Sequence, residues 1–471
     1  LRTVQEAGGV GDWSRKQIEL LTMQPLLVYD VEPEVEYMFM DSAFATEGGL
    51  RTILEIIHLT LTRANWNEQA LERVKDIYRM FAINTNKNIE LLTHDTINKV
   101  IYKDERMMDP NNEALNALTL DGVREVVEAQ FASGALELNI VGDFVPEELD
   151  DMLLALMGSI KAKKPATPLP ETPPLELKDV AKDDPARAQR LWLKDSDERA
   201  CAVAAGPGPS MWAPMRSLVS EIPSYVNQDA FTPEQIAALR DPVNEVAAAK
   251  GNPFAQQSVR RANALATYCA GMMLAEVIGG RLFTTVRDAL GLTYDCNFTM
   301  SFGLQNNDAT TYRLLVTSTP EKIDEAIEAG VRVLRGFKLQ RVSQREVDRA
   351  RLTLLSRHEM DSKTNAYWAD LMQCTNTPDL APLKTVQCIA DLPLMYDAMT
   401  VDDLQEVYEQ LGLAEGEMFT SVTIAGETEP PPYLSRKDVD AAALAAQTLT
   451  AAIGGMNLAE AIKKFKQDKS I

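Results

Sequence analysis

The sequence contains few of the residues from which metal sites are built. Three histidines, His58, His94 and His358, occur among 471 residues. No two of them have the spacing of HxxEH or HxxxH, the patterns that place two imidazoles on one face of a helix. We therefore expect no histidine-based metal site within this chain alone, and an ordinary surface or half-buried position is the simplest interpretation of each histidine.

Cysteine is also scarce, and its distribution excludes two further kinds of site. The five cysteines are odd in number, scattered along the chain and never spaced as CxxC. This pattern argues against a disulfide framework and against a cysteine zinc site, and it favours a reducing compartment. These residues are Cys201, Cys269, Cys296, Cys374 and Cys388.

Two other absences concern membranes and nucleic acids. No apolar run reaches the roughly 18 residues of a membrane helix, and the start lacks a secretory signal pattern, so we expect no membrane span. Because the chain begins at Leu1, we expect a processed product or a fragment.

The net charge is -22, the opposite of what nucleic-acid binding needs. The acidic surplus serves solubility or attracts a basic partner such as a cationic peptide, and both explanations remain open.

The length is too great for one ordinary core, and composition divides the chain into four regions. Residues 1–160 and 188–428 have the patterns of folded domains. Between them, residues 161–187 form a linker rich in proline and charge. The second domain carries an irregular insertion near residues 213–257, and residues 429–471 read as an accessory Ala-rich tail.

The two domains share an order of elements: strand, helix, helix, strand. A capping box of Ser343 and Glu346 marks the start of one helix, and Pro320 is expected to open another. The shared order predicts an α+β protein of two homologous domains. The expected elements are 36–46, 48–61, 67–81 and 136–144 in the first domain, and 311–319, 321–336, 343–358 and 420–427 in the second.

A junction between helix and strand lies at residues 279–302, "GGRLFTTVRDALGLTYDCNFTMSF". An apolar stripe at helical spacing (Leu282, Phe283, Val286, Leu290) ends at Gly291, which can adopt positive φ without strain. Alternation of period two then predicts a strand over 292–302.

Arg287 lies one turn before the end of this helix, and Tyr294 falls on the apolar face of the strand near its start. The two side chains could therefore converge at the corner. Spacing alone favours a structural interpretation instead, in which Arg287 pairs with a carboxylate and Tyr294 is a core tyrosine with its hydroxyl satisfied.

The stretch "GGRLFTTVRDALGLTYD" resembles the C-terminal half of the M16 metallopeptidases. So do "LELNIVGDFVPEELDDML" (136–153) and "VTSTPEKIDEAIEAGVRVLRG" (316–336), and the resemblance extends from about Gly8 to Gly426. In that family an arginine and a tyrosine seven residues apart contact substrate, and Arg287 and Tyr294 match this spacing. The resemblance implies M16-type α/β-sandwich domains joined by a linker.

The resemblance also implies what this chain lacks. A full M16 enzyme has four homologous domains, and its N-terminal half carries HxxEH and holds Zn²⁺. The helix at the equivalent place here, residues 12–21, has no histidine. This chain would then be the third and fourth domains, with the opening strand of the third missing. It would bind no metal and would be inactive alone.

The function implied is that of the substrate-binding half of a zinc metalloendopeptidase. The likeness is closer still to family members that remove transit peptides from precursors in the chloroplast stroma; the mitochondrial matrix is the alternative location. Tyr294 would donate to the oxyanion of the transition state, and Arg287 would bind a carbonyl or carboxylate of the substrate. Expected partners are basic, extended transit peptides and the N-terminal catalytic half. The competing hypothesis is an inactive structural subunit, like the core proteins of respiratory complex III.

Overall fold

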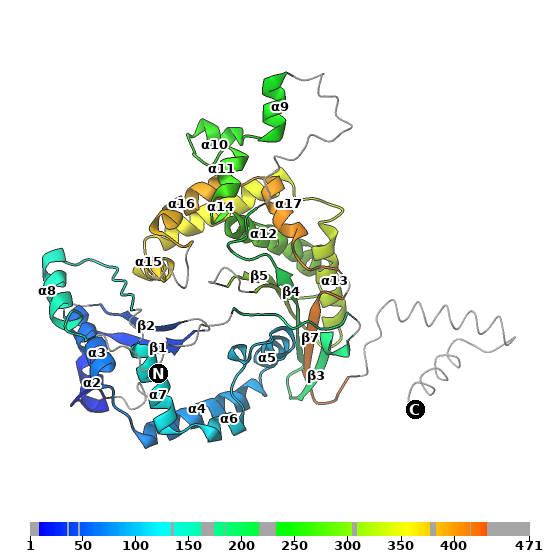
Figure 1. Ribbon diagram of the computed structural model, residues 1–471. Coiled ribbons are helices and arrows are strands. Elements are labelled where there is room, and N and C mark those ends of the chain that lie inside the picture. Colours follow the sequence, from blue (N-terminus) through cyan, green and yellow to red (C-terminus); the bar gives the residue numbers. More distant parts are fainter. Residues whose placement is uncertain are drawn as a thin grey trace.

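Two sheets of unequal size organise the protein, as the computed structural model in Figure 1 shows. The larger sheet has five strands in the order β3-β7-β4-β6-β5, and only β3 and β7 run parallel to each other. Its strands are β3 (Ala188–Lys194), β4 (Arg199–Gly208), β5 (Asp295–Ser301), β6 (Thr310–Ser318) and β7 (Phe419–Gly426). The structure describes residues 9–34, 37–45, 48–132, 136–161, 174–182, 184–215, 232–303, 309–376, 383–414 and 416–430.

The central strand β4 is covered on both faces, because its sequence "RACAVAAGPG" is small and apolar. Successive side chains of a strand point to opposite faces. Ala202 and Ala204 accordingly belong to the main core, whereas Val203 and Ala205 contact a second cluster.

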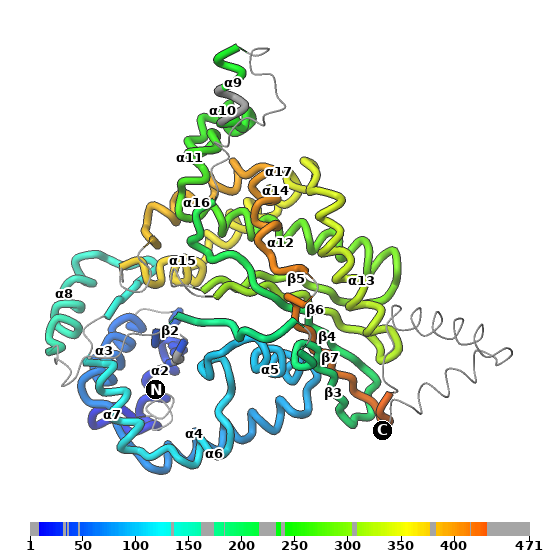
Figure 2. Tube along the Cα trace, turned by 45° about the vertical axis from the view of Figure 1, so that its right-hand side comes forward, coloured from blue at the N-terminus to red at the C-terminus, as the bar shows by residue number. Residues whose placement is uncertain are grey.

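The main core lies between one face of the sheet and a group of helices. Helix α12 packs against β5, and α13 packs against β4 and β6. The helices of this part are α9 (Pro233–Arg240), α10 (Glu245–Ala249), α11 (Gln257–Ala262), α12 (Ala266–Leu282), α13 (Ile323–Gly336), α14 (Gln344–Asp361), α15 (Asn365–Met372), α16 (Val386–Ala398) and α17 (Val401–Glu409). Helix α9 belongs to the irregular insertion near residues 213–257 and projects from the body of the molecule in both views (Figures 1 and 2).

Helix α5 (Ile89–Ile101), which precedes the linker in sequence, covers the opposite face of the large sheet. Figure 2 shows α5 beside β4 and β7. Ile97 and Ile101 pack with Val203 in the second cluster. Two buried hydroxyl pairs cross the same interface, from Thr93 and Tyr102 of the first part to Thr423 (2.7 Å) and Thr311 (3.2 Å).

The first part carries the smaller sheet, an antiparallel pair of β1 (Val28–Pro33) and β2 (Met38–Ala43). Its core gathers Val10, Ile18, Leu27, Ile53 and Ile56. The other helices of this part are α2 (Arg15–Met23), α3 (Gly49–Arg63), α4 (Glu68–Thr85), α6 (Asn112–Ala117), α7 (Leu120–Phe131) and α8 (Pro146–Leu156).

Most of the predicted elements are confirmed, but two need correction. The expected strand at 136–144 is wrong: these residues form no strand, and Leu136 is 57% exposed. The alternating apolar residues of this segment resemble one face of a strand, but a strand also needs a neighbouring strand with which to form hydrogen bonds. In the smaller sheet, β1 and β2 pair with each other and not with residues 136–144. The helix expected to start at Pro320 begins instead at Ile323, after a turn that contains the proline.

About half of the linker (162–173 and 183) and nearly all of the tail (431–471) fall outside the described residues. The described end of the linker is held against the first part: Leu175 is buried with Ile97, and Lys178 donates its backbone N–H to the carbonyl of Ile101 (2.7 Å).

Contrary to the expectation from apolar runs, residues Ala266–Ala289 are long and apolar enough to cross a membrane by length and composition. Half of its most apolar 18-residue stretch is buried inside the described structure. Helix α12 lies in the core against β5, α14 and α17, which is a position that selects the same apolar composition.

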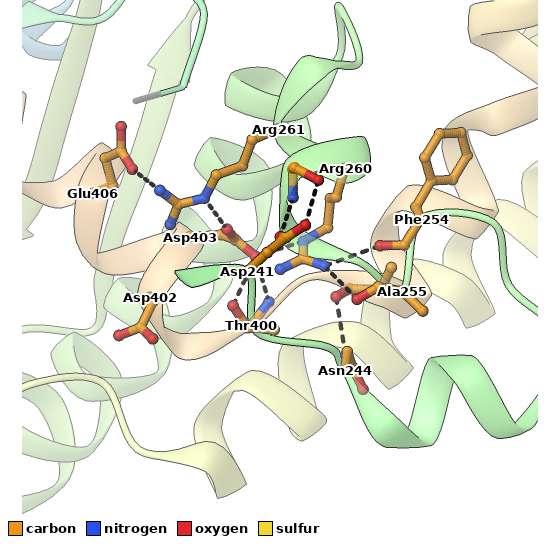
Figure 3. A network of polar contacts seen from close by, with 12 residues as sticks. Asp241, Asn244, Phe254, Ala255, Arg260, Arg261, Thr400, Asp402, Asp403 and Glu406 are labelled. Atoms are coloured by element: carbon orange, nitrogen blue, oxygen red, sulfur yellow. Dashed lines mark hydrogen bonds and ion pairs between the residues drawn. The ribbon is translucent and has the colours of Figure 1, made fainter. Parts of the chain in front are cut away.

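A buried ion-pair network fixes α11, and so the start of α12, to α17 (Figure 3). Arg260 and Arg261 each donate from Nε to one oxygen of Asp403, both at 2.8 Å. All three side chains are 1% exposed or less. Asp403 also accepts from the backbone N–H of Thr400 (3.0 Å), which closes a capping box at the start of α17.

Candidate functional site

The candidate site is the corner where α12 turns into β5. Helix α12 continues into a π-helical segment, η4 (Phe283–Ala289), and Gly291 ends it with φ of +61°. The predicted helix stop is therefore confirmed. Short π-helical segments are found frequently at functional sites.

The corner is pinned to the large sheet by hydrogen bonds. The Thr293 hydroxyl contacts the carbonyls of Asp295 (2.7 Å) and Thr317 (2.5 Å). The Ser318 hydroxyl donates to the carbonyl of Leu292 (2.5 Å). Leu292 and Thr293 are buried, so the backbone just before Tyr294 is held firmly in place.

Tyr294 does not lie on the buried face of the strand, as the alternation predicted. Its side chain is 83% exposed, because β5 begins only at Asp295 and the preceding residue is still part of the corner. The rest of the pattern holds: Phe298 is buried, and Cys296 and Met300 pack against the core. The interpretation of Tyr294 as a core tyrosine is thus wrong.

Arg287 is also exposed, and its guanidinium lies 4.7 Å from the centre of the Phe283 ring. Among the described residues no contact joins Arg287 to Tyr294, and no carboxylate pairs with Arg287. The segment η4 that carries this cation nevertheless packs against β5. Both predicted site residues therefore reach solvent from one rigid corner.

The apolar stripe predicted for this helix is half correct. Leu282 and Val286 are buried, whereas Phe283 and Leu290 are 44% and 49% exposed. Sequence reasoning missed the role of Phe283 as the surface on which Arg287 rests. The spacing of four residues between an aromatic ring and an arginine was the available signal.

All five cysteines are free thiols, and the three histidines have separate partners. His58 contacts the carbonyl of Leu156 (2.7 Å), His94 contacts Arg313 (3.2 Å), and His358 contacts the Tyr367 hydroxyl (2.7 Å). Within the described ranges no three His, Cys, Asp or Glu side chains come together in a way that could hold a metal ion. The side chains of these described residues therefore do not form a site that fits zinc.

Comparison with known proteins adds the family context. The sequence pattern of the peptidase M16 inactive domain matches residues 220–354, a segment that contains both Arg287 and Tyr294. The chain is 34% identical over 428 residues to the chloroplastic stromal processing peptidase of Oryza sativa subsp. japonica. It is 33% identical over 434 residues to that of Arabidopsis thaliana. Each match covers 90% of this chain but spans only about a third (33%) of the relative's length.

Solved structures show the same fold at low sequence identity. The M16 inactive domain from Pseudomonas fluorescens aligns with a TM-score of 0.63 at 14% identity, covering 92% of this chain and 89% of that one. The periplasmic protease PqqL from Escherichia coli aligns with a TM-score of 0.62 at 14% identity, covering 90% of this chain and 40% of that one. The α+β fold expected from the sequence is therefore confirmed as that of M16 inactive domains.

Proposed function

Because this chain contains an M16 peptidase inactive domain and is related along 90% of its length to stromal processing peptidases, we propose that it is the substrate-binding part of such an enzyme. The full enzyme would be a zinc metalloendopeptidase that cleaves transit peptides from imported chloroplast precursors in the stroma. This chain would form its C-terminal half.

The observation that carries the proposal is the exposed pair on the rigid corner. A side chain that serves the fold is normally buried or paired, whereas Tyr294 is 83% exposed beside backbone that is hydrogen-bonded to the sheet. Preorganised donors of this kind stabilise a transition state without the cost of ordering them during the reaction.

An extended peptide also has a place to lie. In the described part of the sheet, β5 is the edge strand and pairs with β6 alone. Its backbone N–H and C=O groups on the other side are available to an added strand. Because Tyr294 directly precedes β5, a peptide on this edge would pass the tyrosine hydroxyl.

In this arrangement Tyr294 donates a hydrogen bond to the developing oxyanion, and the planar fork of Arg287 binds a backbone carbonyl or a carboxylate of the peptide. The described residues do not fit zinc, so we assign the metal to the N-terminal half, where it would activate the attacking water. This chain alone is proposed to be inactive.

The test is precursor cleavage by the full-length enzyme. We expect Tyr294→Phe to lower kcat by about 10²–10³ with little change in KM, since one oxyanion donor is lost. We expect Arg287→Gln to raise KM. Arg345→Gln, which removes an exposed cation from α14, is the matched control and should change neither constant.

If both site variants fold normally and cleave as the parent enzyme does, the catalytic proposal fails. An inactive structural subunit would then explain the chain better. That alternative is consistent with the likeness in fold to a chain of complex III from Candida albicans, which has a TM-score of 0.57 at 12% identity.

A further inference from the structure

A second site lies one turn away along the same helix. A cavity of about 270 Å³ opens between α12 and α14. Glu276, Gly280 and Thr284 line it from one helix at intervals of four residues, so they share one face. Thr284 precedes Arg287 by three positions, and the cavity therefore adjoins the corner without including it.

The two carboxylates of the cavity are already paired. Glu276 accepts from Arg357 (2.8 Å). Glu346 accepts from Arg281 at 2.6 Å and 2.9 Å, and the hydrogen bonds from Arg281 are the main reason that the pKa of Glu346 falls to about 2. Glu346 thus stays anionic at any physiological pH and stays occupied with Arg281.

Arg281 itself is committed to the wall of the cavity. Beyond Glu346, its guanidinium donates to the carbonyls of Gln340 (2.8 Å) and Arg341 (2.9 Å). It also lies 3.9 Å from the centre of the Phe337 ring. Because these contacts engage all three nitrogens of its guanidinium, Arg281 cannot bind a ligand carboxylate with two parallel hydrogen bonds.

Arg349 differs from Arg281 because its guanidinium is not committed to other groups among the described residues. In the part of the chain that the structure describes, its guanidinium has no ion pair and no hydrogen bond, and the side chain is exposed. Its Nη1 lies 3.7 Å from the point where a side chain on Gly280 would begin. The missing side chain at position 280 therefore leaves open space beside an unpaired cation.

We propose that this cavity binds a carboxylate of a peptide chain, with Arg349 as the charged donor. The three arginines and two glutamates around the cavity leave one positive charge uncompensated, which matches the single charge of a carboxylate. A phosphate group carries up to two charges and would remain partly unneutralised beside Glu276 and Glu346. A guanidinium fork also fits a carboxylate with two parallel hydrogen bonds.

The volume suits the end or one side chain of a peptide rather than a larger cofactor. The carboxylate is either the C-terminus or an Asp or Glu side chain. This site does not depend on the cleavage proposal, because binding to it can be measured on this chain without any catalysis.

The experiment uses the purified 471-residue chain and four short peptides of otherwise identical sequence. One has a free C-terminus and no acidic side chain, the second is its C-terminal amide, the third is the amide with an internal Glu, and the fourth is the amide with Gln in that place. Isothermal titration calorimetry measures each affinity, and ligand-observed NMR with acetate as a competitor repeats the comparison.

We expect one of the two carboxylate peptides to bind at least about tenfold more tightly than its neutral partner, which is the scale of one charge-assisted pair. The peptide whose affinity is higher identifies whether the site binds a C-terminal carboxylate or an acidic side chain. Arg349→Gln should abolish the difference, and Gly280→Leu should do so by filling the cavity.

Arg345→Gln is the matched control, since it removes the same charge from the same helix outside the cavity. It should retain the tenfold preference. Equal binding of acidic and neutral peptides by the parent chain would overturn the proposal. So would an equal loss in Arg345→Gln and Arg349→Gln, because general attraction between charges would then explain the preference.

Discussion

Replacing Asp403 by Asn tests how strongly the buried ion-pair network ties α11 to α17. Asp403 is fully buried and provides both oxygens to Arg260 and Arg261, each at 2.8 Å. An amide keeps the shape of the side chain but removes its charge. The single oxygen of the amide can accept from one of the two Nε–H groups but not from both, so at least one buried guanidinium loses its partner at position 403.

Breaking a buried ion pair from one side typically costs about 3–5 kcal/mol, since the remaining charge is left uncompensated. The neighbouring residue provides the control. Asp402 occupies the same first turn of α17, but it is 51% exposed and pairs with an exposed Arg341 at 3.3 Å. Asp402→Asn should cost about 0–1 kcal/mol.

Urea unfolding of both variants, followed by circular dichroism and tryptophan fluorescence, measures the difference. We expect the unfolding midpoint of Asp403→Asn to move to clearly lower urea, while that of Asp402→Asn stays near the parent. Similar midpoints for the two variants would refute the reasoning, because they would mean that the buried network adds no more than a surface pair does.

Three further predictions concern pH, backbone geometry and salt. Burial and then Arg313 lower the pKa of His94, so its contribution to stability is complete above the usual value of 6.5 and decreases as the pH falls below it; His94→Gln should flatten this part of the curve of stability against pH. Gly291→Ala should cost about 1–2 kcal/mol in unfolding free energy, because φ there is +61°; an unchanged midpoint would contradict this. If the acidic surplus steers basic peptides, kcat/KM of the full enzyme should fall as salt is added, whereas a flat salt profile would leave solubility as the role of the charge.

Local features of this fold could be predicted from the sequence because they depend on near neighbours. The helix from Ser343 followed from its capping box, which the structure confirms, and the stop at Gly291 followed from the need for positive φ. The period of two in β5 likewise predicted which side of the strand meets the core.

The failures involve partners distant in sequence. Tyr294 fits the alternation of apolar and polar residues in the sequence, but hydrogen bonds from Thr293 and Ser318 determine where β5 begins. Asp403 meets Arg260 across 143 positions, and the cavity beside Arg349 exists only because α12 and α14 pack together. The sequence pattern of a single helix or strand could not have predicted the ion pair or the cavity.

The position of α5 has a consequence for how this protein can be divided. Residues before the linker supply a layer of the sandwich whose sheet comes from residues after it. A fragment cut at the linker would expose Val203, Ala205 and Phe419 to water and would invite aggregation. The first and second parts should therefore melt together as one cooperative unit.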